Sequence, residues 1–589
     1  MKNRSSAVIT AVIAVVLIAL PTSAGAIAAP FPAAEQPSLL AGITDAGCTS
    51  RAGTEITATD ADAPVTATIE TAAIVASASG EPACSLSGVI DGRVGYTVQL
   101  PQNEWNGRYF QTGCGGFCGY TPIDGCADAL TAGFAVGAEN SGHVDPLGGA
   151  EWALDDAEAE ADWGYRSPHL LAVVADAVIR DIYGQPAETT YFQGCSTGGR
   201  QALSEAQRYP DDFDGIVAGA PALYQNYLAV LSQGGFEMAN RRADGTTILT
   251  PAAIEVVSAA VQETCGGVGG VVPDPLACEF SLSSVQCADG ASGVDCLSAE
   301  QVRVVERLYA APVADDGTVL YPGGMPLGSE ALWPGYSVST GAALSGSGSY
   351  AQNVLRYLAF PDDPGADYAL ADFDPSTQYR QLDAQAEVYN ADDPDLSQFA
   401  DGGGKLILWH GLADPLITPY GTIDYFESVV EHDGGADATD EYARLFLLPG
   451  VGHCNGGPGE STVDWLASIV EWVEGDVPPA SVTAERRVGA EVVSARTVEP
   501  FVSGSADAKI SPWFAGSRVA APVDPEPVET PAPDPTGGDV DGGTDAALPG
   551  VLPATGAAVG WPLVAGGVMS LGAGAVLLLV RRRVRGARS

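Results

Sequence analysis

Short apolar runs alternate with amphipathic stretches through most of the chain. Six such runs predict buried strands, at residues 108–112, 134–137, 190–193, 216–218, 405–410 and 444–448. Residues 168–183 and 198–208 have the spacing of helices that bury one face. Strands and helices in alternation favour a mostly parallel sheet with helices on both faces, so the predicted fold class is α/β. Such sheets bind ligands at the carboxyl ends of their strands, where we look for chemistry.

The first residues of the chain have the pattern of a secretory signal peptide. Lys2 and Arg4 precede an apolar run over residues 7–20, and small residues follow it. A membrane-spanning helix is the alternative, but it needs about 20 apolar residues and this run is shorter. We therefore expect residues 1–28 to be removed on secretion.

The last residues contain a second targeting signal. An LPxTG-type pentapeptide at 552–556 precedes an apolar stretch over 557–580, and five arginines follow within the last nine residues. A plain membrane anchor would show the last two features, whereas all three in order resemble a sortase sorting signal of Gram-positive bacteria (residues 551–589). This resemblance implies cleavage between Thr555 and Gly556, with sortase and peptidoglycan as partners through Thr555. The hydrophobic helix would tether the chain to the membrane before processing.

Residues 519–550 are rich in Pro, Asp, Glu, Gly and Thr and cannot bury enough apolar surface to fold. We interpret them as a linker across the cell wall. The expected location is therefore secreted and anchored to the wall of a Gram-positive bacterium.

The amino-acid composition excludes one class of partner and indicates disulfide bonds. The chain has 27 basic and 74 acidic residues, a formal charge of −47, which argues against nucleic acid as a partner because phosphates would be repelled. The same charge keeps a secreted protein soluble. Apolar residues make up 46 % of the chain, enough for a packed interior. Eleven cysteines outside the reducing cytosol indicate disulfides.

A G-x-S-x-G motif at residues 194–198 follows one predicted strand and opens a predicted helix. That context is typical of a nucleophile elbow, a tight turn that exposes the hydroxyl of Ser196. The Thr197 amide can then face a developing oxyanion. The motif by itself is common in a Gly-rich chain, so its strand–turn–helix context carries the prediction.

The general base must be one of five histidines. His453 follows the strand at 444–448, and Asp414 follows the strand at 405–410. The order Ser196, Asp414, His453 is that of α/β-hydrolases and differs from that of two unrelated protease classes. His143 and His169 precede or closely neighbour the elbow. His432 lies in an acidic loop, and His410 precedes any plausible acid.

Two cysteines flank the proposed nucleophile and base. Cys195 precedes Ser196, and Cys454 follows His453. If they are bonded, their Cα atoms lie within about 4.4–6.8 Å and the two catalytic residues are neighbours. The alternative is that both are ordinary buried or structural cysteines.

Three segments carry a resemblance to a known family. Residues 191–221, 409–419 and 447–459 closely resemble the tannase and feruloyl esterase family, and the resemblance extends over roughly residues 45–500. It implies an α/β-hydrolase fold with a large inserted lid, rich in disulfides, and a Cys195–Cys454 bond. Members cleave esters of aromatic acids: galloyl esters, feruloyl esters of plant polysaccharide and mono(2-hydroxyethyl) terephthalate.

The family also implies how the chain is divided. The core would comprise residues 40–221 and 396–518, with the lid at 222–395. An oxyanion loop would lie at 113–119, where amides near Gly115 and Gly116 join that of Thr197; which amide points inward stays open. Lid aromatics contact the acid portion of the substrate in the family, but here we expect them mainly to pack the lid: Trp333, Tyr350, Tyr357 and Phe360.

The sequence departs from the family at its calcium loop. The matching segment, residues 265–278, is short and keeps only Asp274, so we expect the calcium site to be lost, with no metal or other cofactor required. The cysteine pair near the end of the family's domain is also absent around residues 496–516. Local disulfides are expected at Cys265–Cys278, Cys287–Cys296 and Cys48–Cys84. Three cysteines remain with their pairing open, one of them free: Cys114, Cys118 and Cys126.

These observations support a wall-anchored serine esterase. It would hydrolyse small or polysaccharide-linked esters of galloyl, feruloyl or related acids through an acyl-enzyme. The alternative is a non-catalytic binding or adhesion protein on the same scaffold, which leaves the intact Ser–Asp–His set unexplained. The sequence does not specify the natural substrate or the oligomeric state.

Overall fold

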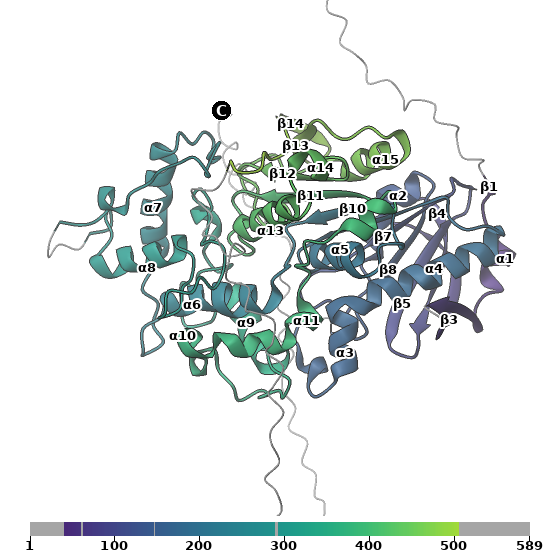
Figure 1. Cartoon of the computed structure of the whole chain (residues 1–589), viewed down its shortest axis with the longest axis horizontal. Helices are drawn as coiled ribbons and strands as arrows, with labels where there is room; N and C mark the ends of the chain where they lie inside the picture. Colours follow the sequence, from purple (N-terminus) through teal and green to yellow (C-terminus); the bar gives the residue numbers. More distant parts are fainter. Residues whose placement is uncertain (1–39, 61–62, 146–147, 289–292, 506–589) are drawn as a thin grey trace, which may run out of the picture. The chain divides into compact units, whose positions relative to one another are not determined.

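A computed structural model describes residues 40–60, 63–145, 148–288 and 293–505 (Figure 1). All of these belong to the first of two compact units, Met1–Ala521, and the second unit is Pro522–Ser589. The predicted signal peptide, linker and sorting signal lie outside the described residues. Within the described residues, no helix is both long enough and apolar enough to cross a membrane.

A ten-stranded sheet forms the centre of the fold, in the order β12-β11-β10-β9-β7-β8-β5-β4-β3-β2. The half from β12 to β8 is parallel throughout. Its six strands coincide with the six apolar runs of the sequence: β7 (Arg108–Thr112), β8 (Ala135–Glu139), β9 (Thr189–Cys195), β10 (Gly215–Gly219), β11 (Lys405–Gly411) and β12 (Ala443–Leu448). The predicted α/β class is confirmed.

Alternate residues of the parallel strands face two separate cores. Ile216 and Ala218 of β10 pack with the helices on one face, whereas Val217 between them packs on the other. The first face is covered by α4 (Ser167–Tyr183), α5 (Thr197–Arg208) and α13 (Pro419–His432), and the second by α15 (Trp465–Gly475). Burial on both faces explains why these strands are continuous apolar runs in the sequence.

The antiparallel half of the sheet was not predicted. It comprises β2 (Thr54–Asp60), β3 (Ala63–Ala76), β4 (Pro82–Ile90) and β5 (Val94–Pro101). In β4 buried residues alternate with half-buried ones, and four of its nine residues are Ser, Ala or Gly, so their apolar contrast is weak. A Cys48–Cys84 disulfide fastens α1 (Asp45–Thr49) to β4.

Between β10 and β11 the chain makes a long insertion, where sequence analysis placed the lid. Figure 1 draws it in teal to green, and among its described residues it is helical, with only isolated bridges. It has a core of its own around Trp333 and Val257. Its α-helices are α6 (Gly235–Ala239), α7 (Pro251–Thr264), α8 (Ala299–Tyr309), α9 (Gly346–Tyr357), α10 (Pro375–Gln378) and α11 (Ala386–Tyr389), and α12 (Ser397–Asp401) leads back to the sheet.

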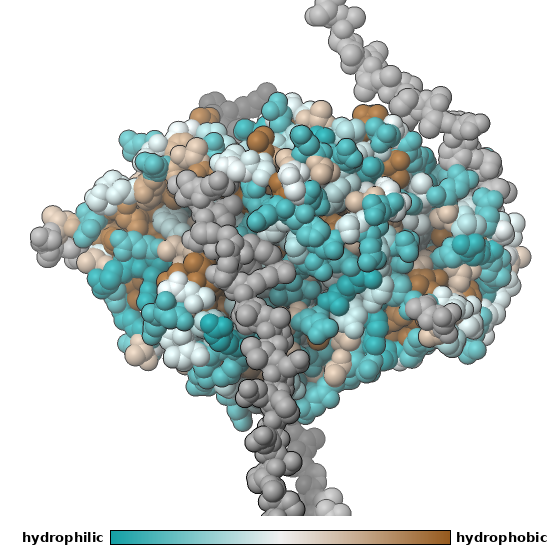
Figure 2. Space-filling view, in the orientation of Figure 1, coloured by the Kyte–Doolittle hydropathy of each residue, from teal (hydrophilic) through white to brown (hydrophobic). Residues whose placement is uncertain are grey.

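Smaller elements complete the described chain. They are β1 (Leu40–Ala41), β6 (Glu104–Trp105), α2 (Ala127–Thr131), α3 (Ala157–Ala161), α14 (Ala436–Thr439), and a closing hairpin of β13 (Val482–Val488) and β14 (Glu491–Val498). The face drawn in Figure 2 is mostly hydrophilic, with apolar residues in scattered patches, in keeping with the large excess of acidic residues.

Candidate active site

Ser196 occupies a one-residue turn between β9 and α5. Its backbone has φ 67° and ψ −121°, a conformation that non-glycine residues rarely adopt. Surrounding hydrogen bonds hold it there: the Ser196 amide donates to the Gly219 carbonyl at 3.0 Å, and the Ser196 carbonyl accepts from the Ala222 amide at 3.1 Å. A side chain at Gly194 would collide with the backbone of Gly198, so the turn requires glycine there. This is the geometry of a nucleophile elbow.

Asp414 and His453 form a hydrogen-bonded pair at the ends of β11 and β12. His453 Nδ1 lies 2.7 Å from Asp414 Oδ2, and the Asp414 side chain is completely buried. Its Oδ1 accepts from the amides of Leu416 and Ile417 at 2.8 and 3.1 Å. Burial raises the pKa of the Asp414 carboxyl, but the charge of His453 and hydrogen bonds from His410 and His453 outweigh it, so the pKa lies well below its ordinary value. Asp414 is therefore ionised at neutral pH.

The Cys195–Cys454 disulfide links the elbow to the histidine loop. The two Cα atoms are 5.9 Å apart, although the residues are separated by 259 positions in the chain. Ser196 and His453, which adjoin these cysteines, are brought into one site. Among the described hydrogen bonds none joins the Ser196 hydroxyl to the imidazole, a contact that in many hydrolases tightens only when substrate binds.

The loop at residues 113–119 packs directly against the start of α5. Gly113 approaches so closely that an added Cβ would lie 2.7 Å from the Gly198 Cα. The Thr197 hydroxyl donates to the Gly116 carbonyl at 2.8 Å, and a Cys114–Cys118 disulfide closes the loop. An added Cβ at Gly115 or Gly116 would meet no atom within 4 Å, so both residues border open space.

Most backbone amides of residues 113–119 already donate a hydrogen bond. Four donate within the protein, those of Gly113, Cys114, Cys118 and Gly119. Within the described structure no hydrogen bond uses the amides of residues 115–117. Together with the Thr197 amide at the first turn of α5, they are the candidates for an oxyanion hole, and Phe117 was not predicted.

A buried polar network supports the loop from behind. Gln201 of α5 accepts from the Cys114 amide at 3.0 Å and donates to Glu139 Oε1 at 3.0 Å. The other Glu139 oxygen accepts from the Ser141 amide. Burial raises the pKa of Glu139 to about 7, although the hydrogen bonds from Ser141 and Gln201 act to lower it. The sequence did not reveal this network, because its members are up to 87 residues apart.

Lid side chains reach the site. The Tyr350 ring stacks on Phe117 with centroids 4.3 Å apart, and its hydroxyl accepts from Gln225 at 3.0 Å. Tyr336 is partly exposed, and burial together with the Asp414 charge raises the pKa of its phenol to about 12. The other lid aromatics considered in the sequence are packed inside: Trp333 and Tyr357 are buried and Phe360 is partly so.

The structure decides the four remaining predictions on cysteine pairing. Cys48–Cys84, Cys265–Cys278 and Cys287–Cys296 are bonded as expected. In the trio left open, Cys114 pairs with Cys118, and Cys126 is a free buried thiol whose pKa is raised by burial. In the shortened loop at 265–278, the Asp274 carboxylate accepts from the Ala277 amide at 3.0 Å.

One further group of acidic and imidazole side chains comes together in the described structure. His169, Glu205 and Asp212 have potential metal-ligand atoms within 4.8 Å of one another. Both His169 nitrogens already face carboxylates, Asp212 at 2.6 Å and Asp60 at 3.2 Å. Burial and the Asp212 charge raise the pKa of Glu205 well above its ordinary value. Glu205 lies nine residues beyond Ser196 on α5, about 13 Å away at the helical rise per residue.

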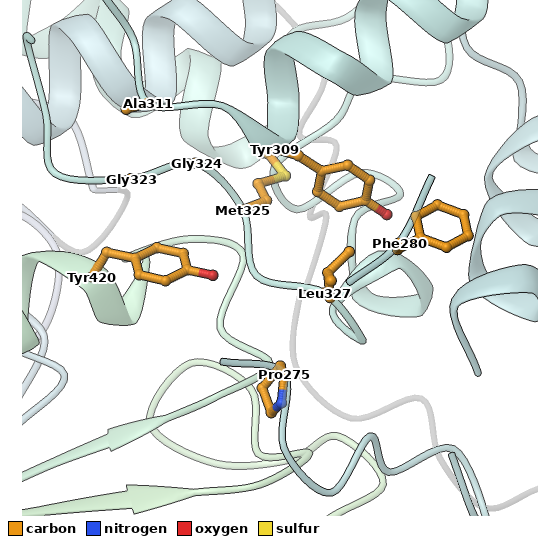
Figure 3. Close-up of a pocket in the computed structure, with 9 residues that line it drawn as sticks. All are labelled: Pro275, Phe280, Tyr309, Ala311, Gly323, Gly324, Met325, Leu327 and Tyr420. Carbon is orange, nitrogen blue, oxygen red and sulfur yellow. The ribbon is translucent and has the colours of Figure 1, made fainter. Parts of the chain in front are cut away.

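A cavity of about 190 Å³ lies between the insertion and the start of α13, and its lining does not include Ser196, Asp414 or His453 (Figure 3). Aromatic rings from three segments surround it: Phe280, Tyr309 at the end of α8, and Tyr420 at the start of α13. The Tyr309 hydroxyl donates to Glu330 Oε1 at 2.8 Å, and the Gly328 amide donates to the same oxygen at 2.9 Å. Glu330 Oε2 is buried without a hydrogen-bond partner.

We expect Glu330→Gln to stabilise the protein above about pH 4.5, with the full gain reached above about pH 7. Burial raises the pKa of Glu330 to about 7, so between about pH 4.5 and 7 the folded state binds more protons than the unfolded state. Stability is therefore lost as pH rises through this window. A glutamine keeps Oε1 and places an amide at the unpartnered oxygen. Urea unfolding should give equal free energies at pH 4 and a gain of up to about 3 kcal/mol for the variant at pH 8.

Glu300→Gln is the matched control for this experiment. Glu300 lies in the first turn of α8, but it is exposed and hydrogen-bonded to Arg242, which lowers its carboxyl pKa. This variant should gain no stability at pH 8. Equal pH dependence of the Glu330→Gln variant and the wild type would show that Glu330 does not titrate in this range.

The parallel half-sheet, the elbow and the order Ser196, Asp414, His453 define the class of this protein: it is an α/β-hydrolase. The chain belongs to the tannase and feruloyl esterase family, whose family model, described as "Tannase and feruloyl esterase", matches residues 83–503.

Curated relatives cover most of the chain. The mono(2-hydroxyethyl) terephthalate hydrolase of Piscinibacter sakaiensis is 32 % identical over 489 residues, which span 70 % of this chain and 80 % of that one. A probable feruloyl esterase of Arthroderma benhamiae is 34 % identical over 421 residues, spanning 67 % and 76 %. With the family match, these relatives establish the protein as a carboxylic ester hydrolase.

Solved structures share the fold. Feruloyl esterase B from Aspergillus oryzae matches with a TM-score of 0.66 and 25 % identity, over 74 % of this chain and 92 % of that one. The tannin acyl hydrolase from Aspergillus niger has a TM-score of 0.61 at 21 % identity, over 79 % and 93 %, and supports the fold alone. The predicted α/β-hydrolase fold is confirmed.

Proposed function

We propose that this protein is a serine esterase that cleaves carboxylic esters of aromatic acids through an acyl-enzyme. The observation that carries the proposal is the disulfide-linked site: Cys195–Cys454 joins the strained Ser196 elbow to a His453 that is hydrogen-bonded to a buried Asp414. A non-catalytic adhesion protein would have no use for this arrangement.

The proposed reaction has two steps. His453 takes the proton of Ser196, whose oxygen attacks the ester carbonyl, and Asp414 stabilises the imidazolium that forms. The amides of Thr197 and of residues 115–117 donate to the oxyanion. His453 then protonates the leaving alcohol. Water attacks the acyl-enzyme by the same route and releases the acid.

The acyl group that we propose is aromatic: galloyl, feruloyl or a related acid, on a small alcohol or on polysaccharide. Of the relatives named above, one is a mono(2-hydroxyethyl) terephthalate hydrolase and one a probable feruloyl esterase. Tyr336 and Tyr350 of the insertion and Phe117 of the oxyanion loop place aromatic rings around the site. Such rings favour stacking on a planar acid.

A substrate panel tests this proposal. The purified protein is assayed with galloyl, feruloyl and terephthaloyl monoesters and with an acetyl ester, and we expect an aromatic ester to have the highest kcat/KM. Labelling with a fluorophosphonate probe reports the nucleophile independently of substrate choice. If the protein neither hydrolyses any ester nor reacts with the probe, the proposed serine esterase is refuted. A preference for the acetyl ester would refute only the aromatic acyl group.

We also propose that the protein is secreted and joined to peptidoglycan by sortase at Thr555, as the pattern of residues 551–589 suggests. Fractionation of a Gram-positive host that expresses the full chain tests this. The protein should be covalently bound in the wall fraction and should move to the membrane fraction in a host that lacks sortase. Equal distribution in both hosts would exclude sortase anchoring.

We propose further that the protein needs no calcium or other cofactor, because the loop at 265–278 has one carboxylate and that group caps a turn. Incubation with excess EDTA should leave the melting temperature and kcat unchanged. Readdition of calcium should also have no effect. A fall in melting temperature that calcium reverses would show that a site is present.

A further inference from the structure

A second histidine contacts the acid of the proposed triad. His410 is the penultimate residue of β11 and is completely buried. Its Nε2 lies 2.7 Å from the Ile417 carbonyl oxygen and 3.3 Å from Asp414 Oδ2, the same oxygen that His453 contacts. Its Nδ1 lies 2.8 Å from the Thr422 hydroxyl. The proposed mechanism gives this imidazole no role.

The partners of His410 determine where its proton lies. A carbonyl oxygen only accepts hydrogen bonds, so Nε2 must carry a proton that points toward Ile417 and Asp414. Thr422 can donate its hydroxyl proton to Nδ1. A neutral ring with the proton on Nε2 is therefore fully satisfied, and the buried site needs no additional charge.

This geometry holds the carboxylate on both sides. Oδ1 of Asp414 accepts two amides of its own loop, and Oδ2 lies between the rings of His410 and His453. The Nε2–H of His410 faces both the Ile417 carbonyl oxygen and Asp414 Oδ2. The imidazole therefore also ties the far end of the loop from Gly411 to Ile417 back to β11. The carboxylate has little freedom to rotate away from His453.

We infer that His410 is a positioning residue for ester hydrolysis, which holds Asp414 in line with His453 and shares part of the carboxylate charge. The inference rests on the proposed function. His410 acts through Asp414 and touches no reacting atom. A histidine that only filled the core would affect folding but would leave the pH dependence of catalysis unchanged.

The pH dependence can be assigned because few titratable groups face Asp414. His410 and His453 come from the strand ends, and the phenols of Tyr321 and Tyr336 come from the insertion. Burial raises the pKa of both phenols, to about 12 for Tyr336, so they stay neutral between pH 5 and 9. A change in the acid limb therefore reports the imidazole that acts as the base.

The test compares His410→Leu with His410→Gln in the full chain. Leucine removes the donor, whereas glutamine keeps an N–H near the position of Nε2. We expect kcat for an aromatic ester to fall about 10- to 100-fold in the leucine variant with little change in KM. The acid limb of kcat/KM should move to higher pH, because a carboxylate that shares less charge with residue 410 stabilises protonated His453 more strongly. The His410→Gln variant should recover most of the lost kcat, and its acid limb should lie close to that of the wild type.

His432→Gln is the matched control, since that histidine is exposed at the end of α13 and should leave kcat and the pH profile as in wild type. If His410→Leu does not fold, Thr422→Val weakens the same arrangement and should shift the acid limb in the same direction with a loss of about 3- to 10-fold. An unshifted acid limb in whichever variant folds would overturn the inference while the wild type remains active. A wild type that neither hydrolyses esters nor reacts with the fluorophosphonate would overturn the proposed function and this inference with it.

Discussion

Ser196→Ala abolishes hydrolysis of every aromatic ester that the wild type cleaves, if Ser196 is the nucleophile. Alanine keeps the backbone of the elbow but has no oxygen to attack the ester carbonyl, and loss of a catalytic serine lowers kcat by about 10⁴- to 10⁶-fold in enzymes with this triad. Initial rates with a feruloyl or galloyl ester measure the effect. Labelling by the fluorophosphonate probe should disappear together with the activity.

Ser397→Ala serves as the matched control because Ser397 lies exposed at the start of α12. It should keep the rate and the labelling of the wild type. Equal melting temperatures of the two variants would show that the loss at Ser196 is chemical. A Ser196→Ala protein that still turns over more than about one hundredth of the wild-type rate would assign the nucleophile to another residue.

The parallel half of the sheet could be predicted because each strand is buried on both faces. Residues 108–112 coincide with β7, and the ends of the other five runs all lie within two residues of the observed strand ends. The antiparallel strands could not be found in this way. β3 and β4 face the core on one side only and are built largely from Thr, Ser and Ala, so alternation along them carries little apolar contrast.

The same distinction applies to the active site: some of its residues follow from local sequence signals, and others from contacts between distant segments. Ser196, Asp414 and His453 each follow a predicted strand, so their order along the chain identifies them together. Neither the use of the Cys114 amide by Gln201 nor the contact of His410 with Asp414 follows from spacing alone. Both depend on which way a side chain points after packing. The Cys114–Cys118 pair stayed open because three nearby cysteines allow three pairings.

Removing the Cys195–Cys454 disulfide should cost both stability and activity. The bond closes a loop of 259 residues, and the chain-entropy relation gives about 5 kcal/mol of stabilisation for such a loop. The double variant Cys195→Ala/Cys454→Ala should therefore lose roughly 3–5 kcal/mol in the free energy of unfolding. We expect kcat to fall about 10- to 100-fold as well, because the elbow and the histidine loop are no longer held together and catalysis depends steeply on their alignment. Urea unfolding and ester hydrolysis measure the two effects separately.

A second disulfide separates chain entropy from positioning. Cys287 and Cys296 are nine residues apart in the insertion, and the same relation gives about 2–3 kcal/mol for so short a loop. Their double alanine variant should lose that stability but keep the wild-type kcat at temperatures where it is folded. If both variants keep the wild-type kcat, the 195–454 bond only restricts the unfolded chain, and the contacts of Asp414 with His410 and His453 suffice to hold the site. A kinetic loss confined to the 195–454 variant shows instead that the covalent bond sets the distance between the serine and the imidazole.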